Sequence, residues 1–220
     1  MRIKKSHIET QFEISYLVME MNKRKTRSFC YIIFNKPYGV VCQFSGGENR
    51  KTLAHYGPFP KEVYPVGRLD ADSEGLVLLT NDGALKHQLL EPKYRHGPTY
   101  LVQVERVPTA DSLRKLRKGI VIEGRRTLPA DVELIEVEPR LPPRLVPIRF
   151  RKNVPTAWLN VTLREGRNRQ IRKMTAAIGH PTLRLMRIAV GPLTLGGLQP
   201  GQHRELSPRE VERLRRAVRK

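Results

Sequence analysis

Apolar residues along this chain gather in short runs that have the length and composition of β-strands. The run LVLLT at 76–80 is continuous, which is typical of a strand buried on both faces, whereas TYLVQVE at 99–105 alternates. Turn residues follow the first run at Asn81-Asp82-Gly83. By the same criteria, further strands are predicted at 29–34, 40–44, 121–122, 132–137, 145–150 and 158–163.

Other segments have helical periodicity and recognisable ends. Thr109 and Asn168 can each cap a helix, and Ser207-Pro208-Arg209-Glu210 is a capping box with proline at the first helical position. The predicted helices span 84–90, 109–119, 168–178 and 207–220. Many short strands separated by helices, without an internal repeat, predict an α+β fold with a mainly antiparallel sheet.

The distribution of polar positions divides the chain into three parts. Residues 1–28 lack a clean periodicity and end in a basic run, so we expect a flexible basic tail. Residues 29–206 are expected to form one domain, followed by a basic C-terminal helix over 207–220. No apolar run reaches the ~18 residues of a membrane span, and acidic residues interrupt any signal-peptide core. We therefore expect a cytoplasmic protein that does not bind membranes.

The excess of basic residues indicates the kind of molecule that this protein binds. The 220 residues include 41 Lys and Arg against 21 Asp and Glu, a formal net charge of +20. Basic residues concentrate in the last third, where residues 141–190 carry a single acid, Glu165. Such a surface predicts a polyanionic partner, most simply nucleic acid, and disfavours self-association, so a monomer is expected. Composition alone does not distinguish RNA from DNA.

Metal and disulfide chemistry are not expected. The two cysteines, Cys30 and Cys42, are too few for a disulfide scaffold or a cysteine-rich zinc site, and the six histidines include no pair at helical ligand spacing. The segment that begins at Asp70 resembles the start of a calcium loop. That interpretation fails because its twelfth position is Asn81 and because a strand follows it. We expect no metal and no cofactor.

The densest polar cluster lies in VGRLDADSEGLVLLTNDG at 66–83. Arg68 and Asp70 are two residues apart, so in an extended segment their side chains leave the same face. On its own, a carboxylate between strands is more often a capped loop residue than a reactive group. Tyr100 favours a functional interpretation, because a flat aromatic on a strand can stack on an unpaired base.

Four cations add to this interpretation. They lie at the start of one predicted helix, where backbone N–H groups also attract phosphate. They are Arg167, Arg169, Arg172 and Lys173. The alternative is a solvated helix face, but the surrounding segment offers only one acid as a partner, which favours phosphate contact.

Several blocks of the chain together resemble the RsuA-type pseudouridine synthases. They are YIIFNKPYG, GRLDADSEGLVLLTNDG, TYLVQVE, REGRNRQIRKM and GHPTLRLMRIAVGPLTLGGLQPGQHREL, and the resemblance covers about residues 29–206. It implies a catalytic domain with an active-site cleft between two lobes, acting without a cofactor on ribosomal RNA, expected to be that of the large subunit, or on a pre-ribosomal particle. Many relatives carry a separate RNA-binding domain of ~60 residues before the catalytic part, and residues 1–28 leave no room for one.

The resemblance also assigns roles to individual residues. It makes Asp70 the catalytic aspartate and Arg172 the cation that pairs with it. It places Arg68 in the space left by the flipped nucleotide, Tyr100 on the target uracil and Ile171 in the uracil pocket. Lys36 and Pro37 match a turn that supports the active-site loop. The full set of predicted substrate-binding residues is Arg68, Tyr100, Ile171, Arg172, Lys36, Arg167 and Lys173.

The implied reaction breaks the N1–C1′ bond of a uridine, turns the base and rejoins it through C5. Asp70 must be ionised, whether it attacks C1′, attacks the base or removes the 2′ proton, and the sequence does not choose among these paths. Two other functions stay open at this point. One is a non-catalytic rRNA-binding or ribosome-assembly factor. The other is a hydrolytic N-glycosylase, which would release free uracil.

Overall fold

The computed structural model describes residues 28–46, 49–91, 97–148 and 151–218. The predicted tail, 1–28, lies outside these residues apart from its last position. The strands are β1 (Tyr31–Lys36), β2 (Tyr64–Pro65), β3 (Glu74–Thr80), β4 (Pro98–Glu105), β5 (Val121–Ile122), β6 (Arg125–Arg126), β7 (Asp131–Ile135), β8 (Thr156–Thr162), β9 (Thr182–Val190), β10 (Leu193–Thr194) and β11 (His203–Glu205). The helices are α2 (Gly83–Leu90), α3 (Ala110–Lys118), α4 (Gln170–Ala177) and α5 (Pro208–Ala217), with one short helical turn at Leu53–Tyr56.

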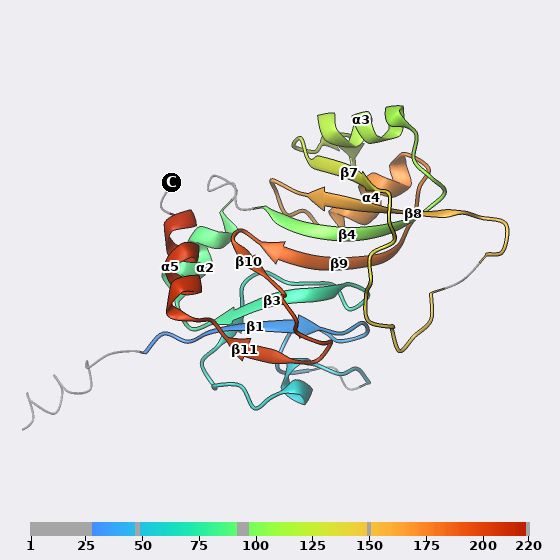
Figure 1. Ribbon diagram of the computed structural model, residues 1–220. Coiled ribbons are helices and arrows are strands. Elements are labelled where there is room, and N and C mark those ends of the chain that lie inside the picture. The colour runs from blue at the N-terminus through green and yellow to red at the C-terminus, as the bar shows by residue number, and fades with distance from the viewer. Residues whose placement is uncertain (1–27, 47–48, 92–96, 149–150, 219–220) are drawn as a thin grey trace, which may run out of the picture.

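Within the described residues, one nine-stranded sheet runs through the molecule in the order β11-β1-β3-β9-β4-β8-β7, with β2 on β3 and β10 on β9 (Figure 1). All neighbours are antiparallel except β3 and β9, which pair in parallel. The remaining two strands, β5 and β6, form a separate hairpin. The predicted α+β fold with a mainly antiparallel sheet is confirmed.

The parallel pair is where the two halves of the sheet meet. It spans only Glu74 opposite Met186 and Gly75 opposite Arg187. Gly75 has φ +103°, and a Cβ there would overlap the backbone carbonyl of Arg187. Glycine is therefore required at this contact both for its backbone conformation and for the close approach of β9.

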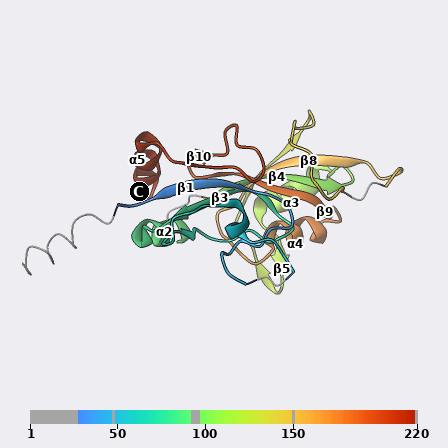
Figure 2. The same ribbon diagram turned by 90° about the horizontal axis from the view of Figure 1, so that it is seen from below.

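On either side of this junction, apolar side chains of the helices pack against those of the strands in hydrophobic clusters. Beyond β9, the cluster of β4, β7 and β8 includes Leu113 and Leu116 of α3 and Ile171 and Met174 of α4. On the other side, Leu214 of α5 packs with β1 and β3. The opposite face of β1 and β3 is covered by the segment between Val40 and Leu69. Figure 2 shows α5 on one side of the sheet and α2 and α4 on the other.

Most predicted elements are present, and their ends follow local chemistry. Thr109 caps α3, and the Ser207 hydroxyl accepts a hydrogen bond from the Glu210 N–H at the start of α5. The predicted helix over 207–220 is not a separate appendage, because Leu214 and Val218 are buried in the main core. No helix among the described residues is long and apolar enough to cross a membrane.

Three element predictions are wrong in part. Residues 40–44 form only an isolated bridge from Val41 to Thr52, because Val40 and Cys42 are buried by the loop rather than by a ladder. Residues 145–148 are not a strand, and Leu145 is 93% exposed. The cap of α4 is Arg169, with φ +49°, instead of Asn168.

One central strand was not predicted. The segment TLRLMRIAV forms β9, which lies between β3 and β4 in the middle of the sheet. Two arginines interrupt its apolar run, and a strand buried on both faces has no alternation to reveal it. Both arginines, Arg184 and Arg187, are buried.

Candidate active site

A cleft of about 480 Å³ opens beside the junction of β3 and β9. Its walls come from both halves of the sheet, so it lies between two lobes as the sequence predicts. Its lining segments are the loop 66–73, the end of α2, the start of β4, the loop 163–169 with the start of α4, and β9.

Five of the predicted site residues line this cleft. They are Arg68, Asp70, Tyr100, Arg167 and Ile171. Tyr100 is half-buried and packs against the cores on both sides of the sheet junction, which fixes its ring. Arg68 is exposed, whereas Ile171 is buried in the wall.

Asp70 lies on a loop that backbone hydrogen bonds hold in place. The Ser73 N–H donates to the Asp70 carbonyl at 3.0 Å, and the Gly39 N–H donates to the Ala71 carbonyl at 2.7 Å. The Asp70 side chain is 39% exposed, and its carboxylate has one charged contact, to Arg169 Nη1 at 3.4 Å. The carboxylate thus keeps acceptor capacity that faces the cleft.

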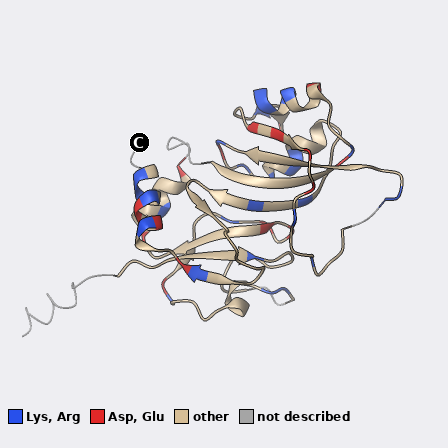
Figure 3. Ribbon diagram, in the orientation of Figure 1, with Lys and Arg blue, Asp and Glu red and all other residues tan. Residues whose placement is uncertain are grey.

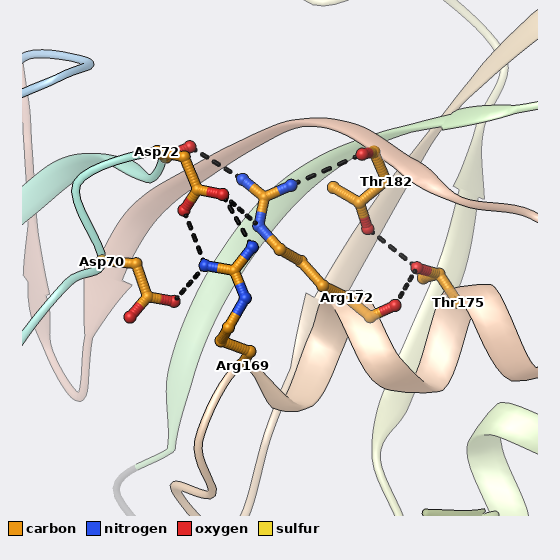
Figure 4. Close-up of polar contacts among 6 residues, drawn as sticks. All are labelled: Asp70, Asp72, Arg169, Arg172, Thr175 and Thr182. Carbon is orange, nitrogen blue, oxygen red and sulfur yellow. Dashed lines mark hydrogen bonds and ion pairs between the residues drawn. The ribbon is translucent and has the colours of Figure 1, made fainter.

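Arg169 joins Asp70 to its neighbour Asp72 (Figure 4). It donates to Asp72 through Nη2 at 2.8 Å and through Nη1 at 3.1 Å. Burial raises the pKa of Asp72, but the hydrogen bond from Arg169 and the charge of Arg172 outweigh that effect and lower it overall. This network therefore keeps a cation beside Asp70.

The prediction that Arg172 pairs with Asp70 is not what the structure shows. Arg172 Nη2 donates to the backbone carbonyl of Asp72 at 2.7 Å, and Nη1 donates to the carbonyl of Thr182 at 3.4 Å (Figure 4). Arg172 Nε also lies 3.4 Å from Asp72 Oδ2, so Arg172 holds both the backbone and the carboxylate of Asp72, whereas Arg169 contacts the carboxylates of Asp70 and Asp72. The cation in contact with Asp70 is Arg169.

Lys36 does not face the cleft, although the sequence places it among the substrate contacts. It is fully buried, and its ammonium donates to the carbonyls of Val40 at 2.7 Å and Pro37 at 3.1 Å. Burial lowers the pKa of Lys36 to about 8. Its bonds hold the turn whose Gly39 N–H supports the loop of Asp70, which is the supporting role that the resemblance implies for this turn.

The two other predicted cations are engaged with the β5–β6 hairpin. Arg167 donates to the carbonyls of Ile122 at 3.0 Å and Arg125 at 3.1 Å, while Lys173 pairs with Glu123 at 2.6 Å. Lys173 is not part of the cleft lining. These contacts dock the hairpin against the wall of the cleft.

Arg169 and Arg187 line the cleft but are not among the predicted site residues. Arg169 belongs to the basic cluster seen in the sequence, but its contact with Asp70 depends on the fold. Arg187 lines the cleft from β9, and the only sequence signal for it is a charge inside a long apolar run. Together with Arg68, Arg164 and Arg167, these residues make the lining richer in cations than in the acids Asp70, Glu91 and Glu165.

Basic side chains also lie outside the cleft. Figure 3 shows Lys and Arg positions on α3 and on α5, at opposite ends of the molecule. A cation-rich cleft with basic surface at both ends suits a long polyanion better than a small neutral ligand.

Comparison with known proteins agrees with this geometry. A family model described as RNA pseudouridylate synthase matches residues 30–177. The ribosomal large subunit pseudouridine synthase E of Vibrio parahaemolyticus is 55% identical over 80% of this chain and 73% of its own length. The protein of the same name from Xanthomonas campestris pv. campestris is 50% identical over 84% of this chain and 99% of its own.

More distant relatives extend the same pattern. The ribosomal large subunit pseudouridine synthase B of Bacillus subtilis is 39% identical over 84% of this chain and 71% of its own length. A crystal structure described as a pseudouridylate synthase superposes with a TM-score of 0.72 at 30% identity, over 86% of this chain and 75% of the other.

Proposed function

The chain belongs to the RNA pseudouridylate synthase family, and from that premise we propose that it converts a specific uridine of large-subunit ribosomal RNA into pseudouridine, with Asp70 as the catalytic residue. The main support for this proposal is the position of the Asp70 carboxylate in the cleft and its few contacts with the protein. This carboxylate lines the cleft on a loop held by backbone hydrogen bonds and, among the described residues, has a single charged contact, to Arg169 at 3.4 Å. Glu165, in the same lining, already accepts hydrogen bonds from Leu128 and Gln170.

The reaction is an isomerisation, so the atoms of the substrate suffice. The N1–C1′ bond breaks, the base turns, and C5 bonds to C1′ while the proton on C5 is replaced by one on N1. Attack at C1′, attack on the base and removal of the 2′ proton each require Asp70 to be ionised. Enclosure by the cleft would limit hydrolysis of the separated base.

The target nucleotide must leave its stack to reach Asp70, at a cost of a few kcal/mol. Stacking of the uracil on Tyr100 would offset about 1–3 kcal/mol of that cost. Arg68 is exposed at the mouth of the cleft and is free to occupy the space that the nucleotide leaves. Ile171 supplies an apolar wall for the base.

The finer points of the assignment are also proposals. Residues 29–206 form the catalytic domain, with the helix after Ser207 packed onto it. The substrate is ribosomal RNA, free or in a pre-ribosomal particle, and the protein acts as a cytoplasmic monomer. The relatives named for the large ribosomal subunit and the net charge of +20 support these statements.

The test is base-resolved pseudouridine mapping of total RNA from cells that lack this protein. Wild type, Asp70→Asn and Asp111→Asn are returned in parallel, the last as a control because Asp111 lies on α3, outside the cleft lining. We expect one missing site, restored by wild type and Asp111→Asn but not by Asp70→Asn. If no site is missing, the protein is an RNA-binding factor; if purified protein releases free uracil, it is a glycosylase.

A further inference from the structure

Two arginines of β9 are buried to the same extent but are bonded very differently. Arg184 is 7% exposed and Arg187 is 6% exposed. Arg184 donates hydrogen bonds to the Glu74 carboxylate from Nε at 2.9 Å and from Nη2 at 2.8 Å. Its Nη2 also donates to the Pro142 carbonyl at 2.9 Å. Its charge is thus paired inside the protein, and its Nε and Nη2 both have acceptors.

Arg187 is not satisfied in this way. Its Nε donates to the Leu76 carbonyl at 2.6 Å, but its Nη2 is buried and has no hydrogen-bond partner in the part of the chain that the structure describes. Among the described residues, no carboxylate lies within ion-pair distance of Arg187, whereas Arg184 pairs with Glu74 at 2.8 Å. A buried donor left unbonded costs about 1–3 kcal/mol, and more when it is charged. Such a cost is unusual in a folded protein unless a ligand relieves it.

The position of Arg187 indicates what that ligand is. Arg187 lines the cleft together with Asp70 and Ile171. It also lies directly opposite Tyr100 in the pairing of β4 with β9. Paired residues of antiparallel strands project on the same face with Cβ atoms about 4.5–5.5 Å apart. A base stacked on Tyr100 would therefore present its edge to the Arg187 guanidinium.

The depth of Arg187 favours a base over the RNA backbone. The residue is only 6% exposed although it lines the cleft, and a flipped base is the part of a nucleotide that enters a cleft most deeply. A uracil edge offers two carbonyl oxygens, and an arginine donates hydrogen bonds but does not accept them.

We propose that Arg187 donates a hydrogen bond from Nη2 to a carbonyl oxygen of the flipped uracil and stabilises the charge that develops on the base. This inference rests on the proposed function. When the N1–C1′ bond breaks, its electron pair goes to the base and spreads over N1 and the carbonyl oxygens. The negative charge on the base disappears when C5 bonds to C1′, and the proton on C5 is then lost while N1 takes up a proton. A fixed cation in a dry cleft stabilises such charge without reorganisation.

The first measurement uses single-turnover rates on an RNA oligonucleotide that spans the mapped uridine. Loss of one such donor reduces a catalytic rate by about 100-fold to 1000-fold. We expect this loss for Arg187→Met and for Arg187→Lys, with the dissociation constant for the oligonucleotide within a few-fold of wild type. Arg187→Lys keeps the charge and tests the proposal even if Arg187→Met does not fold. A variant that folds as wild type does and retains the full rate would overturn it.

The second measurement separates contact with the base from a structural role. The target uridine is replaced by 2-thiouridine or 4-thiouridine, in which sulfur is a poorer acceptor than oxygen. We expect one of these to slow the wild-type protein and to cause no further loss in the Arg187 variants. Equal thio effects in wild type and variants would show that Arg187 does not contact the base. If instead a neutral methylphosphonate beside the target removes the difference between wild type and variants, the contact is to phosphate and the proposal is wrong.

Arg184→Met is the matched control, because it removes a buried arginine of the same strand that does not line the cleft. It should lower the melting temperature yet keep the thio effect of wild type. Wild type and Asp70→Asn on the unmodified oligonucleotide test the proposed function separately. No pseudouridine from wild type would refute that function, whereas an active wild type with the same thio effects in every variant would refute only the role of Arg187.

Discussion

Two clusters of aspartate and arginine lie in different parts of the molecule and differ in how completely they are bonded. At the start of α2, Asp82 accepts hydrogen bonds from the Tyr31 hydroxyl at 2.7 Å and the Leu85 N–H at 3.0 Å, and Arg215 lies 3.4 Å away. The Asp82 side chain is 7% exposed, whereas that of Asp70 in the cleft is 39% exposed. The residue types are the same, but only the Asp82 cluster is closed.

The difference shows how one pair of residue types serves two purposes. Burial raises the pKa of Asp82, but its bonds from Leu85 and Tyr31 and the charge of Arg215 lower it overall. Both carboxylate oxygens of Asp82 accept hydrogen bonds from protein donors, so the cluster stabilises the fold. Asp70 has no such set of donors, and its remaining capacity is available to a ligand. Incomplete bonding is therefore a better guide to function here than the presence of a charged pair.

The largest expected effect comes from neutralising the open cluster. Asp70→Asn should abolish isomerisation, because an amide is neither a nucleophile nor a base of useful strength. The exposed side chain contributes little to folding, so the free energy of unfolding should change by no more than about 0.5 kcal/mol. Rates on the mapped RNA and a denaturant titration check both parts. Lost RNA binding or a large loss of stability would make Asp70 structural.

The closed cluster should respond in the opposite way. Asp82→Ala removes the cap of α2 and leaves the Leu85 N–H and the Tyr31 hydroxyl without their acceptor. We expect a loss of about 2–3 kcal/mol in the free energy of unfolding, with the rate per folded molecule preserved. Urea unfolding and assays well below the melting temperature measure these quantities. Unchanged stability would contradict the comparison.

A smaller effect is expected at the aromatic wall of the open site. Tyr100→Ala should weaken stacking of the flipped base by about 1–3 kcal/mol, seen as a slower single-turnover rate. Tyr100→Phe keeps the ring and should retain most of the rate. If Tyr100→Ala were as fast as wild type, the base would not stack there.

The smallest effect concerns pH and α5, which packs beside the closed cluster. Bonds from Arg204 and Ser207 lower the pKa of Glu210 to about 2 from an ordinary 4.5. Since the folded pKa is the lower one, the stabilisation is complete above pH 4.5 and is lost as the pH falls toward 2. For such a solvent-screened pair, we expect about 1 kcal/mol or less. Between pH 5 and pH 3, the melting temperature of wild type should fall by more than that of Glu210→Gln. If the two fall equally, groups other than Glu210 cause the loss of stability in acid.

Much of the fold was predictable because its signals are local. Ser207 and Glu210 form their capping box within four residues, and Thr109 caps the helix that follows it. The strand LVLLT is recognisable from a single apolar run. By contrast, Leu145 and its neighbours were predicted as a strand from composition, but no tertiary contact buries them.

The sequence by itself determined the caps of α3 and α5, the strand pattern of about half the sheet, the α+β class, and the string around Asp70 that marks the family. Only the tertiary structure decided that Arg169, and not Arg172, contacts Asp70, that Lys36 is buried under the loop it supports, and that Arg187 faces the cleft unpaired. Caps and strand patterns depend on neighbours within a few residues. The partner of a charged side chain depends instead on which distant segments meet and how deeply they are buried, and Arg169 and Asp70 are 99 positions apart.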